Sequence, residues 1–184
     1  MAGGVTLIDD EVVRELVYAG GFGALTGALA VVAIPTPLSP VPVSLGVLGV
    51  FLTGVYLPPR AAGGAMLLYL LAGALGAPIF AGGAAGVGPL LGYTAGYLWA
   101  YPVAAVLIGA LASPTDRALR IIGSLVLATV LIYSSGTVGF SLVQQVTLAE
   151  AFLVSALAFV PAELAKIIAT VAIVRVVEAP HITP

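Results

Sequence analysis

The stretch Pro161-Ala162-Glu163-Leu164-Ala165-Lys166 places two charges in an otherwise apolar run that extends from residue 151 to residue 174. A charged side chain in membrane hydrocarbon costs roughly 2.5–3.5 kcal/mol even on insertion scales, so it persists where it faces a partner, a cavity or a ligand. Glu163 and Lys166 stand three residues apart, so they share one face of a helix. Pro161 suits the first turn of that helix, where its missing N–H is no loss. The stretch predicts the start of a membrane helix that carries either a self-neutralising ion pair between packed helices or a ligand site.

The composition of the whole chain identifies an integral membrane protein. Of its 184 residues, 61% are hydrophobic and only 8% are charged, and the mean hydropathy is +1.20. Soluble domains carry about 25% charged residues, so this chain has too few charges to cover a core in water. The N-terminal segment carries Asp9, Asp10 and Glu11 instead of the basic residues that begin a signal peptide. The first apolar run is therefore expected to be a retained membrane span.

The composition also excludes several classes of function. A net charge of −2 without a basic cluster excludes nucleic acid as a partner. The chain has no cysteine, and its single histidine, His181, lies near the C-terminus, so we expect no metal site and no cofactor. A Ser–Lys catalytic dyad would need a tertiary contact between Lys166 and Ser44 or Ser135, and there is no paired-aspartate site or histidine pair. The sequence therefore does not predict an enzyme.

Three runs carry no charged residue: 16–59, 61–115 and 121–149. Each run exceeds the ~20 residues of one span and contains a break, so six transmembrane helices in one domain, residues 1–184, are predicted. The first run breaks at residues 35–42, where four prolines in eight residues cannot continue a helix. The second breaks in the glycine-rich segment 76–89, and the third ends at the Ser-Ser-Gly-Thr-Val-Gly segment 134–139. The fold class is all-α, and the predicted helices cover residues 16–34, 43–57, 61–77, 90–112, 118–134 and 161–177.

A short outer helix over residues 148–159 is expected before the sixth span, because Thr147 and Glu150 have the spacing of a capping box. The alternative is one long helix from 148 to 177 with a kink at Pro161. The orientation follows from five arginines, which all fall on one side of the six-span arrangement: Arg14, Arg60, Arg117, Arg120 and Arg175. The three loops on the other side carry no lysine or arginine, so the positive-inside rule predicts that both termini are cytoplasmic.

Small residues line one face of the first helix, where Gly20, Ala24 and Ala28 recur every four residues. Such spacing lets a second helix approach closely. That helix belongs either to this chain or to another protein, and the sequence leaves both readings open.

Two further segments suit the wall of a small-molecule pocket. Tyr93, Tyr97 and Tyr101 form a stripe roughly 12 Å long on the predicted fourth helix, although ordinary core aromatics have the same spacing. The glycine-rich loop exposes backbone groups that can bond to a ligand, and its candidate contacts are Phe80, Gly82 and Gly83. The chain lacks the G-x-x-x-x-G-K-[ST] pattern of a P-loop, so ATP is not bound by that route.

These residues together predict an outward-facing pocket with one cation, one carboxylate, phenols and loop amides. The matching ligand is small and has an apolar body, an anionic end and a hydrogen-bonding end. A structural or assembly subunit of a membrane complex is the alternative outside transport.

Four ordered segments, which span nearly the whole chain, carry a resemblance to a known family. They are Ile34-Pro35-Thr36-Pro37-Leu38-Ser39-Pro40-Val41-Pro42-Val43-Ser44-Leu45, Leu75-Gly76-Ala77-Pro78-Ile79-Phe80-Ala81-Gly82-Gly83, Gly92-Tyr93-Thr94-Ala95-Gly96-Tyr97-Leu98-Trp99, and the opening stretch 161–166. The chain resembles BioY, the biotin-binding S component of energy-coupling factor (ECF) transporters. The resemblance implies a multi-pass protein of a prokaryotic plasma membrane, a biotin site under the outer loops, and a complex with a transmembrane T component and two ABC-type ATPase subunits.

The resemblance also implies roles for particular residues. Tyr97, Tyr101 and Lys166 would contact biotin, with Lys166 meeting the valerate carboxylate, and the small-residue face of helix 1 would contact the T component. The chain departs from the family pattern at four positions: Ser44 replaces threonine, Gly46 replaces glutamine, Tyr93 replaces the proline of Gly-Pro-Thr, and Glu163 replaces aspartate. A related vitamin or a biotin precursor is therefore the alternative ligand.

Overall fold

The structure is a computed structural model that describes residues 10–37 and 39–177. Six longer helices follow the order of the six predicted spans: α1 (Asp10–Val31), α2 (Gly46–Tyr56), α3 (Pro59–Ala74), α5 (Ala95–Leu111), α6 (Ala118–Gln144) and α8 (Val160–Val176). Shorter elements connect them: strands β1 (Ala33–Thr36) and β2 (Ser39–Ser44), the turn η1 (Ala81–Gly83), α4 (Gly88–Leu91), α7 (Leu148–Ser155) and the turn η2 (Leu157–Phe159). The fold is thus mostly helical, as predicted.

Helix α5 lies at the centre of the packing and contacts α2, α3 and α6, while α1 covers α2 and α3. Small residues allow α5 to approach α2 and the turn that follows it closely. A Cβ at Gly54 of α2 would lie 2.6 Å from the Cβ of Ile108, and a Cβ at Gly109 would lie 2.9 Å from the carbonyl oxygen of Leu57. Ala104 and Ala105 are fully buried at the same interface. Membrane helices pack in this way, because close backbone approach replaces the hydrophobic driving force that water provides.

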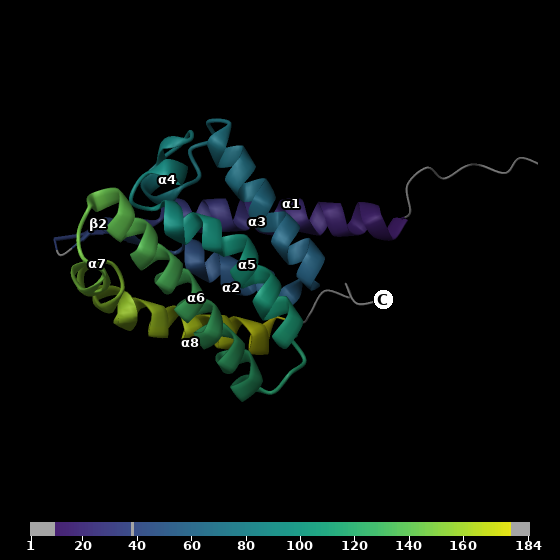
Figure 1. Cartoon of the computed structure of the whole chain (residues 1–184). Coiled ribbons are helices and arrows are strands. Elements are labelled where there is room, and N and C mark those ends of the chain that lie inside the picture. The colour runs from purple at the N-terminus through teal and green to yellow at the C-terminus, as the bar shows by residue number, and fades with distance from the viewer. Residues whose placement is uncertain (1–9, 38, 178–184) are drawn as a thin grey trace, which may run out of the picture.

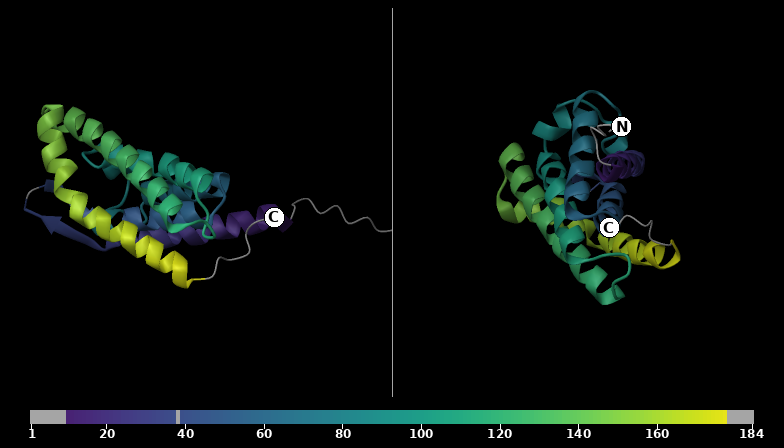
Figure 2. Two further views of the ribbon diagram at one scale, coloured as in Figure 1. Left: turned by 90° about the horizontal axis from the view of Figure 1, so that it is seen from below. Right: turned by 90° about the vertical axis from the view of Figure 1, so that its right-hand side faces the viewer.

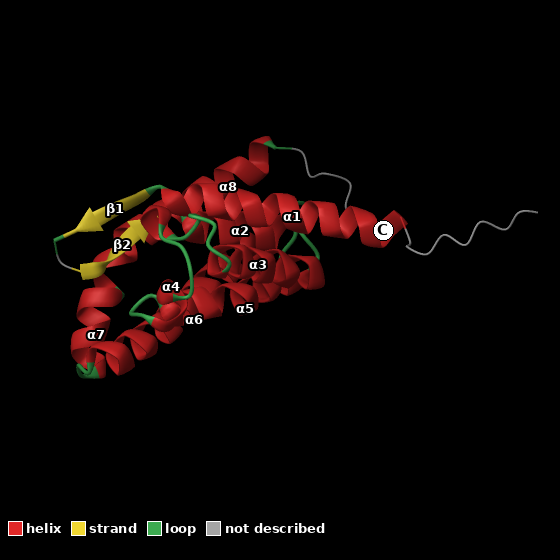
Figure 3. Cartoon of the chain, turned by 90° about the horizontal axis from the view of Figure 1, so that it is seen from above, coloured by secondary structure: helices red, strands yellow, loops and turns green. Residues whose placement is uncertain are grey.

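The connecting segments lie at two opposite ends of the helical body. Figures 1 and 3 show the β1–β2 hairpin and α7 at one end, and Figure 1 places α4 toward the same end. The turn between α2 and α3, the loop between α5 and α6, and the C-terminal end of α8 lie toward the other end, as the turned views of Figure 2 also show. This division matches the predicted separation of arginine-free and arginine-bearing loops.

The proline-rich segment forms a hairpin rather than an irregular loop. β1 and β2 pair antiparallel, with Ala33 opposite Ser44 and Thr36 opposite Ser39, and the register shifts between Ile34 and Thr36. Proline lacks the N–H of a ladder hydrogen bond, and edge strands tolerate this loss. A two-stranded hairpin has only edges, so the prolines fit without breaking it.

The prediction that a helix ends at residue 134 is wrong, because α6 continues through the Ser-Ser-Gly segment to Gln144. These small residues form a helix–helix contact instead of a break. Ser135 Oγ donates to the carbonyl oxygen of Gly96 at 2.7 Å, and a Cβ at Gly139 would lie 2.9 Å from the Cα of Gly96. The next residue, Gln145, caps the helix in a left-handed conformation with a φ of 55°.

Other boundaries differ from the prediction by a few residues. Helix α5 begins at Ala95 rather than at residue 90, because Gly88–Leu91 forms the separate turn α4. The short helix α7 is confirmed, and Thr147 and Glu150 form the predicted capping box. The break between α7 and α8 lies at Ala156, with φ −130° and ψ −57°, so the alternative of one helix kinked at Pro161 is not found. Pro161 lies in the first turn of α8, as predicted.

Two segments within the described ranges are long and apolar enough to cross a membrane: Ala118–Gln144 and Leu148–Val176. α2 and α5 are apolar but shorter. An α-helix rises about 1.5 Å per residue, so neither of these two helices alone reaches the thickness of a bilayer core.

Candidate ligand-binding site

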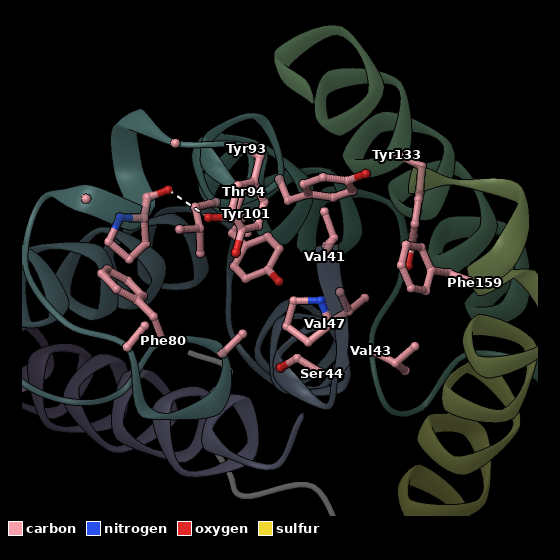
Figure 4. Close-up of a pocket in the computed structure, with 18 of the residues that line it drawn as sticks. Val41, Val43, Ser44, Val47, Phe80, Tyr93, Thr94, Tyr101, Tyr133 and Phe159 are labelled. Carbon is pink, nitrogen blue, oxygen red and sulfur yellow. Dashed lines mark hydrogen bonds between the residues drawn. The ribbon is translucent and has the colours of Figure 1, made fainter. Parts of the chain in front are cut away.

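A cavity of about 280 Å³ lies at the end of the helical body that carries the hairpin and α7 (Figure 4). Its walls come from β2, the segment from Phe80 to Thr94, α5, and single residues of α2, α6, η2 and α8. Small-molecule sites occupy roughly 300–1,000 Å³, so this cavity suits a ligand near the lower end of that range.

Ser44 joins the hairpin to the helices at the edge of the cavity. Its hydroxyl donates to the carbonyl oxygen of Ala30 at 3.0 Å and accepts the backbone N–H of Gly46 at 3.0 Å. Figure 4 shows Ser44 beside Val43 and Val47, which also line the cavity. The predicted residue is thus at the site, with its hydroxyl already holding the start of α2.

The α4 segment is held over α5 by two hydrogen bonds. The Thr94 hydroxyl donates to the carbonyl oxygen of Pro89 at 2.9 Å, and the indole Nε1 of Trp99 donates to the carbonyl oxygen of Leu90 at 3.0 Å. Pro89 and Thr94 line the cavity, so α4 forms part of its cover.

The three candidates in the glycine-rich segment have different positions. Phe80 lines the cavity, is 1% exposed, and meets the ring of Tyr69 edge-on at 5.4 Å. Gly82 and Gly83 do not line it. Their φ angles of 69° and 81° are left-handed, so they shape the turn η1 that places Ala81 and Ala84 on the wall.

Tyr93, Tyr97 and Tyr101 all line the cavity, but they do not form one helical stripe, because Tyr93 precedes α5. Tyr97 donates a hydrogen bond of 2.5 Å to the carbonyl oxygen of Ser155, which ties α5 to α7. Tyr101 is 7% exposed and stacks on Tyr69 with ring centroids 6.3 Å apart. The two helical phenols therefore combine the roles of core residue and cavity wall.

Glu163 and Lys166 form the ion pair that the sequence predicted as one of two readings. Lys166 Nζ donates to Glu163 Oε1 at 2.5 Å, and their side chains are 5% and 4% exposed. Lys166 lines the cavity, whereas Glu163 does not and lines a neighbouring hollow between α6, α7 and α8 instead. A buried pair of this kind loses hydration on both charges, so each partner depends strongly on the other.

Tyr133 and Phe159 are site residues that the sequence analysis missed. The Tyr133 hydroxyl donates to the same Glu163 Oε1 at 2.7 Å, and its ring meets Tyr97 edge-on at 5.6 Å. Figure 4 shows Tyr133 and Phe159 together, on the side of the cavity opposite Phe80. Tyr133 lies thirty residues before Glu163 in the sequence, so no local spacing indicated their contact.

Comparison with known proteins identifies the family of this chain. The BioY family model matches residues 4–181. A biotin transporter BioY of Rhodobacter capsulatus is 34% identical over 180 residues, which cover 89% of this chain and 93% of that protein. The chain belongs to the BioY family.

Further BioY proteins and one solved structure agree with this result. A probable biotin transporter BioY of Bacillus subtilis is 36% identical over 148 residues, which cover 77% of this chain and 79% of that protein. A crystal structure of the S-component for biotin from an ECF-type ABC transporter has a TM-score of 0.81 and 25% sequence identity, and the match covers 91% of this chain and 92% of that one. BioY proteins are transport components, which confirms that the chain is not an enzyme.

The small-residue face of α1 is open in this BioY chain. Gly20, Ala24 and Ala28 are exposed, and a Cβ at Gly20 would meet nothing within 4 Å. Internal packing uses the neighbouring glycines instead, because a Cβ at Gly23 would lie 2.9 Å from the carbonyl oxygen of Ala65 and one at Gly27 would lie 3.0 Å from Ile79.

Lys166 is the basic side chain that lines the BioY cavity among the residues that the structure describes. The arginines Arg14, Arg60, Arg117, Arg120 and Arg175 are exposed and do not line it. In the same part of the chain, no group of three or more His, Cys, Asp or Glu residues is arranged to hold a metal ion.

Proposed function

We propose that this chain is the biotin-binding S component of an ECF-type transporter in a prokaryotic plasma membrane. The observation that carries the proposal is the cavity lined by Lys166 and phenols, in a fold that matches an S-component for biotin over 91% of the chain. Six spans with both termini in the cytoplasm are part of the proposal, supported by the order of the six longer helices and by the arginine distribution.

Biotin suits the chemistry of this cavity. Its fused rings are largely apolar, and valines and aromatic residues form much of the wall. Its ureido group carries two N–H donors and one carbonyl acceptor, and its valerate chain ends in a carboxylate. We propose that Lys166, Tyr97 and Tyr101 contact the ligand, with Ser44, Phe80 and Tyr93 completing the wall. Glu163 acts through Lys166, and Gly82 and Gly83 act by shaping the loop.

The charges around Lys166 favour a particular orientation of biotin. Lys166 is already neutralised by Glu163, so a ligand carboxylate placed against it would leave one net negative charge in a buried site. Such a charge without a counter-ion is costly, whereas a neutral carbonyl can accept a spare lysine N–H without this cost. The family resemblance assigns the valerate carboxylate to Lys166. The charge balance supports the opposite orientation, with the ureido group at Lys166 and the carboxylate at the far end of the cavity from Lys166, and we propose that orientation.

The proposed partners are a transmembrane T component and two ABC-type ATPases. The chain has no P-loop of its own, so another subunit supplies ATP hydrolysis. We propose that the T component packs against Gly20, Ala24 and Ala28, because small residues at four-residue spacing allow close helix contact and this face is open.

Calorimetry on the purified protein tests the proposed ligand. Biotin is expected to bind in the absence of ATP and to raise the melting temperature, whereas thiamine and riboflavin at the same concentrations are expected to do neither. Desthiobiotin, a biotin precursor, covers the alternative ligand class. If biotin gives no heat and no thermal stabilisation at large excess, the assignment is wrong.

A further inference from the structure

Tyr133 lies between the ligand cavity and a second hollow. This second hollow, which we name the lateral groove, has a volume of about 690 Å³ and is formed by α6, α7 and α8. Its wall is largely apolar and includes the exposed side chains Val130, Phe152 and Leu164. Tyr133 is the residue that lines both the cavity and the lateral groove.

Contacts from three neighbouring elements hold the Tyr133 side chain in this position. Its hydroxyl donates to Glu163 Oε1 of α8 at 2.7 Å. Its ring meets Tyr97 of α5 edge-on at 5.6 Å and lies 6.1 Å from the ring of Phe159 in η2. Because both its ring and its hydroxyl are held by contacts, the Tyr133 side chain forms a fixed wall between the two hollows.

We propose that Tyr133 is a partition that closes the ligand cavity, on the side of Lys166, against the lateral groove and so limits the size of ligand accepted there. This inference rests on the proposed function, because it concerns the same ligand cavity. Glu163 contributes indirectly. Its Oε1 accepts a hydrogen bond from the Tyr133 hydroxyl and another from Lys166, so it fixes the position of the Tyr133 side chain.

Removal of the partition has two opposite effects on binding. Without the ring, the cavity would join the apolar lateral groove, so biotin would lose one wall of its site. In the proposed membrane arrangement the exposed groove side chains face lipid. A ligand with an apolar group at the end beside Lys166 would gain the groove as additional contact surface. Loss of the hydroxyl alone would leave the wall in place, because the ring contacts with Tyr97 and Phe159 remain.

The first experiment compares wild type, Tyr133→Ala, Tyr133→Phe and the control Tyr93→Ala, which alters a cavity residue that does not line the lateral groove. Three ligands are titrated: biotin, biotin with a benzyl group on a ureido nitrogen, and biotin benzylamide. Tyr133→Ala is expected to bind the ureido-benzyl ligand at least tenfold more tightly than wild type does, and to bind biotin more weakly. Tyr133→Phe and Tyr93→Ala are expected to show no such gain.

The proposal is overturned if Tyr133→Ala still binds biotin but neither benzyl ligand gains affinity. If Tyr133→Ala does not fold, Tyr133→Leu replaces it, since it shortens the side chain, keeps an apolar residue between Tyr97 and Phe159, and leaves the Glu163–Lys166 ion pair intact. The same tenfold gain is then expected, and its absence overturns the partition.

A second measurement does not depend on biotin and separates failure of the partition from failure of the proposed function. The chain has no cysteine, so Val43→Cys introduces a single thiol in the cavity and Val130→Cys a single thiol in the lateral groove. A long-chain alkyl maleimide dissolved in nanodisc lipid is expected to react with Val43→Cys at least tenfold faster when Tyr133→Ala is also present. Its reaction with Val130→Cys is expected to be unchanged by Tyr133→Ala. Equal rates at Val43→Cys with and without Tyr133 would overturn the partition, whatever the ligand.

Discussion

Lys166 and Glu163 form an ion pair in which neither side chain is more than 5% exposed, and Lys166 is the partner that lines the cavity. The structure shows the self-neutralised pair that was one reading of the sequence. The other reading, a ligand contact through Lys166, stays a proposal that rests on its position in the cavity wall. The two roles separate when the partners are changed singly and together.

Lys166→Ala is expected to destabilise the protein by about 3–5 kcal/mol, because it leaves the Glu163 carboxylate buried without its counter-ion. Lys166→Met combined with Glu163→Gln removes both charges and is expected to recover most of this loss in a thermal melt. The double variant is still expected to bind biotin about 100-fold more weakly than wild type, or roughly 2.8 kcal/mol, because the ligand loses the lysine donor. Wild-type affinity in the double variant would show that Lys166 is structural only.

The proposed orientation predicts that biotin amide binds wild type with an affinity within about tenfold of biotin, because the carboxylate points away from Lys166. Competition calorimetry against biotin measures this ratio. A much larger loss for the amide would instead support the orientation implied by the family resemblance, in which Lys166 meets the carboxylate.

Ala24→Leu is expected to abolish assembly with the T component while leaving biotin binding by the isolated chain unchanged, because Ala24 is exposed and does not line the cavity. Ala172→Leu on α8 is the matched control, since Ala172 is also exposed but lies outside the small-residue face of α1. Co-purification of tagged subunits and calorimetry measure the two effects. If Ala24→Leu also eliminates biotin binding, the face serves internal packing and the partner assignment fails.

Gly136→Ala is expected to destabilise the fold by about 1–3 kcal/mol and to weaken ligand binding, because its Cβ would collide with the ring of Tyr97. Gly123→Ala on the same helix is the control. A Cβ there meets nothing within 4 Å, so this change is expected to be neutral or to stabilise by about 0.5–1 kcal/mol. Thermal melts of the two variants give the comparison, and an equal response would contradict the α5–α6 contact.

The loop between α5 and α6 predicts a small pH dependence of stability. A hydrogen bond from the backbone N–H of Ser113 lowers the pKa of Asp116, and the Ser113 hydroxyl and the Arg120 guanidinium lower it further. Since the folded pKa is depressed, this contribution is present above the ordinary carboxyl pKa of about 3.9 and is lost as the pH falls through the lower folded value. Asp116→Asn is expected to flatten this acid limb in melting curves recorded against pH. An unchanged acid limb would show that other carboxyl groups determine it.

The sequence predicted the features that depend on residue chemistry or local spacing. The buried pair, the capping box of α7 and the order of the longer helices all follow from charges, hydropathy and short-range patterns. Residue spacing predicted a small ligand with an anionic end but did not identify it. The family motifs indicated biotin.

Tertiary contacts explain where the sequence predictions were wrong or incomplete. Ser135 and Gly136 have low helix propensity, but their contacts with Gly96 and Tyr97 keep α6 helical where the sequence indicated a break. The two strands of the hairpin were missed for a similar reason. Their prolines indicated a loop, and the pairing of β1 with β2 is visible only when both segments are placed together. Tyr133 had no partner within one helical turn, so its role depended on a contact that only the fold creates.

Trp99 gives the protein a natural optical probe. It is the single tryptophan of the chain, it is about half exposed, and its indole N–H holds the carbonyl oxygen of Leu90 in the α4 cover. The emission maximum of an indole depends on its hydrogen bonding and on the polarity around the ring. A displacement of α4 would therefore shift the emission maximum of Trp99. Stopped-flow fluorescence after mixing with biotin therefore tests, in an unlabelled protein, whether ligand binding displaces α4.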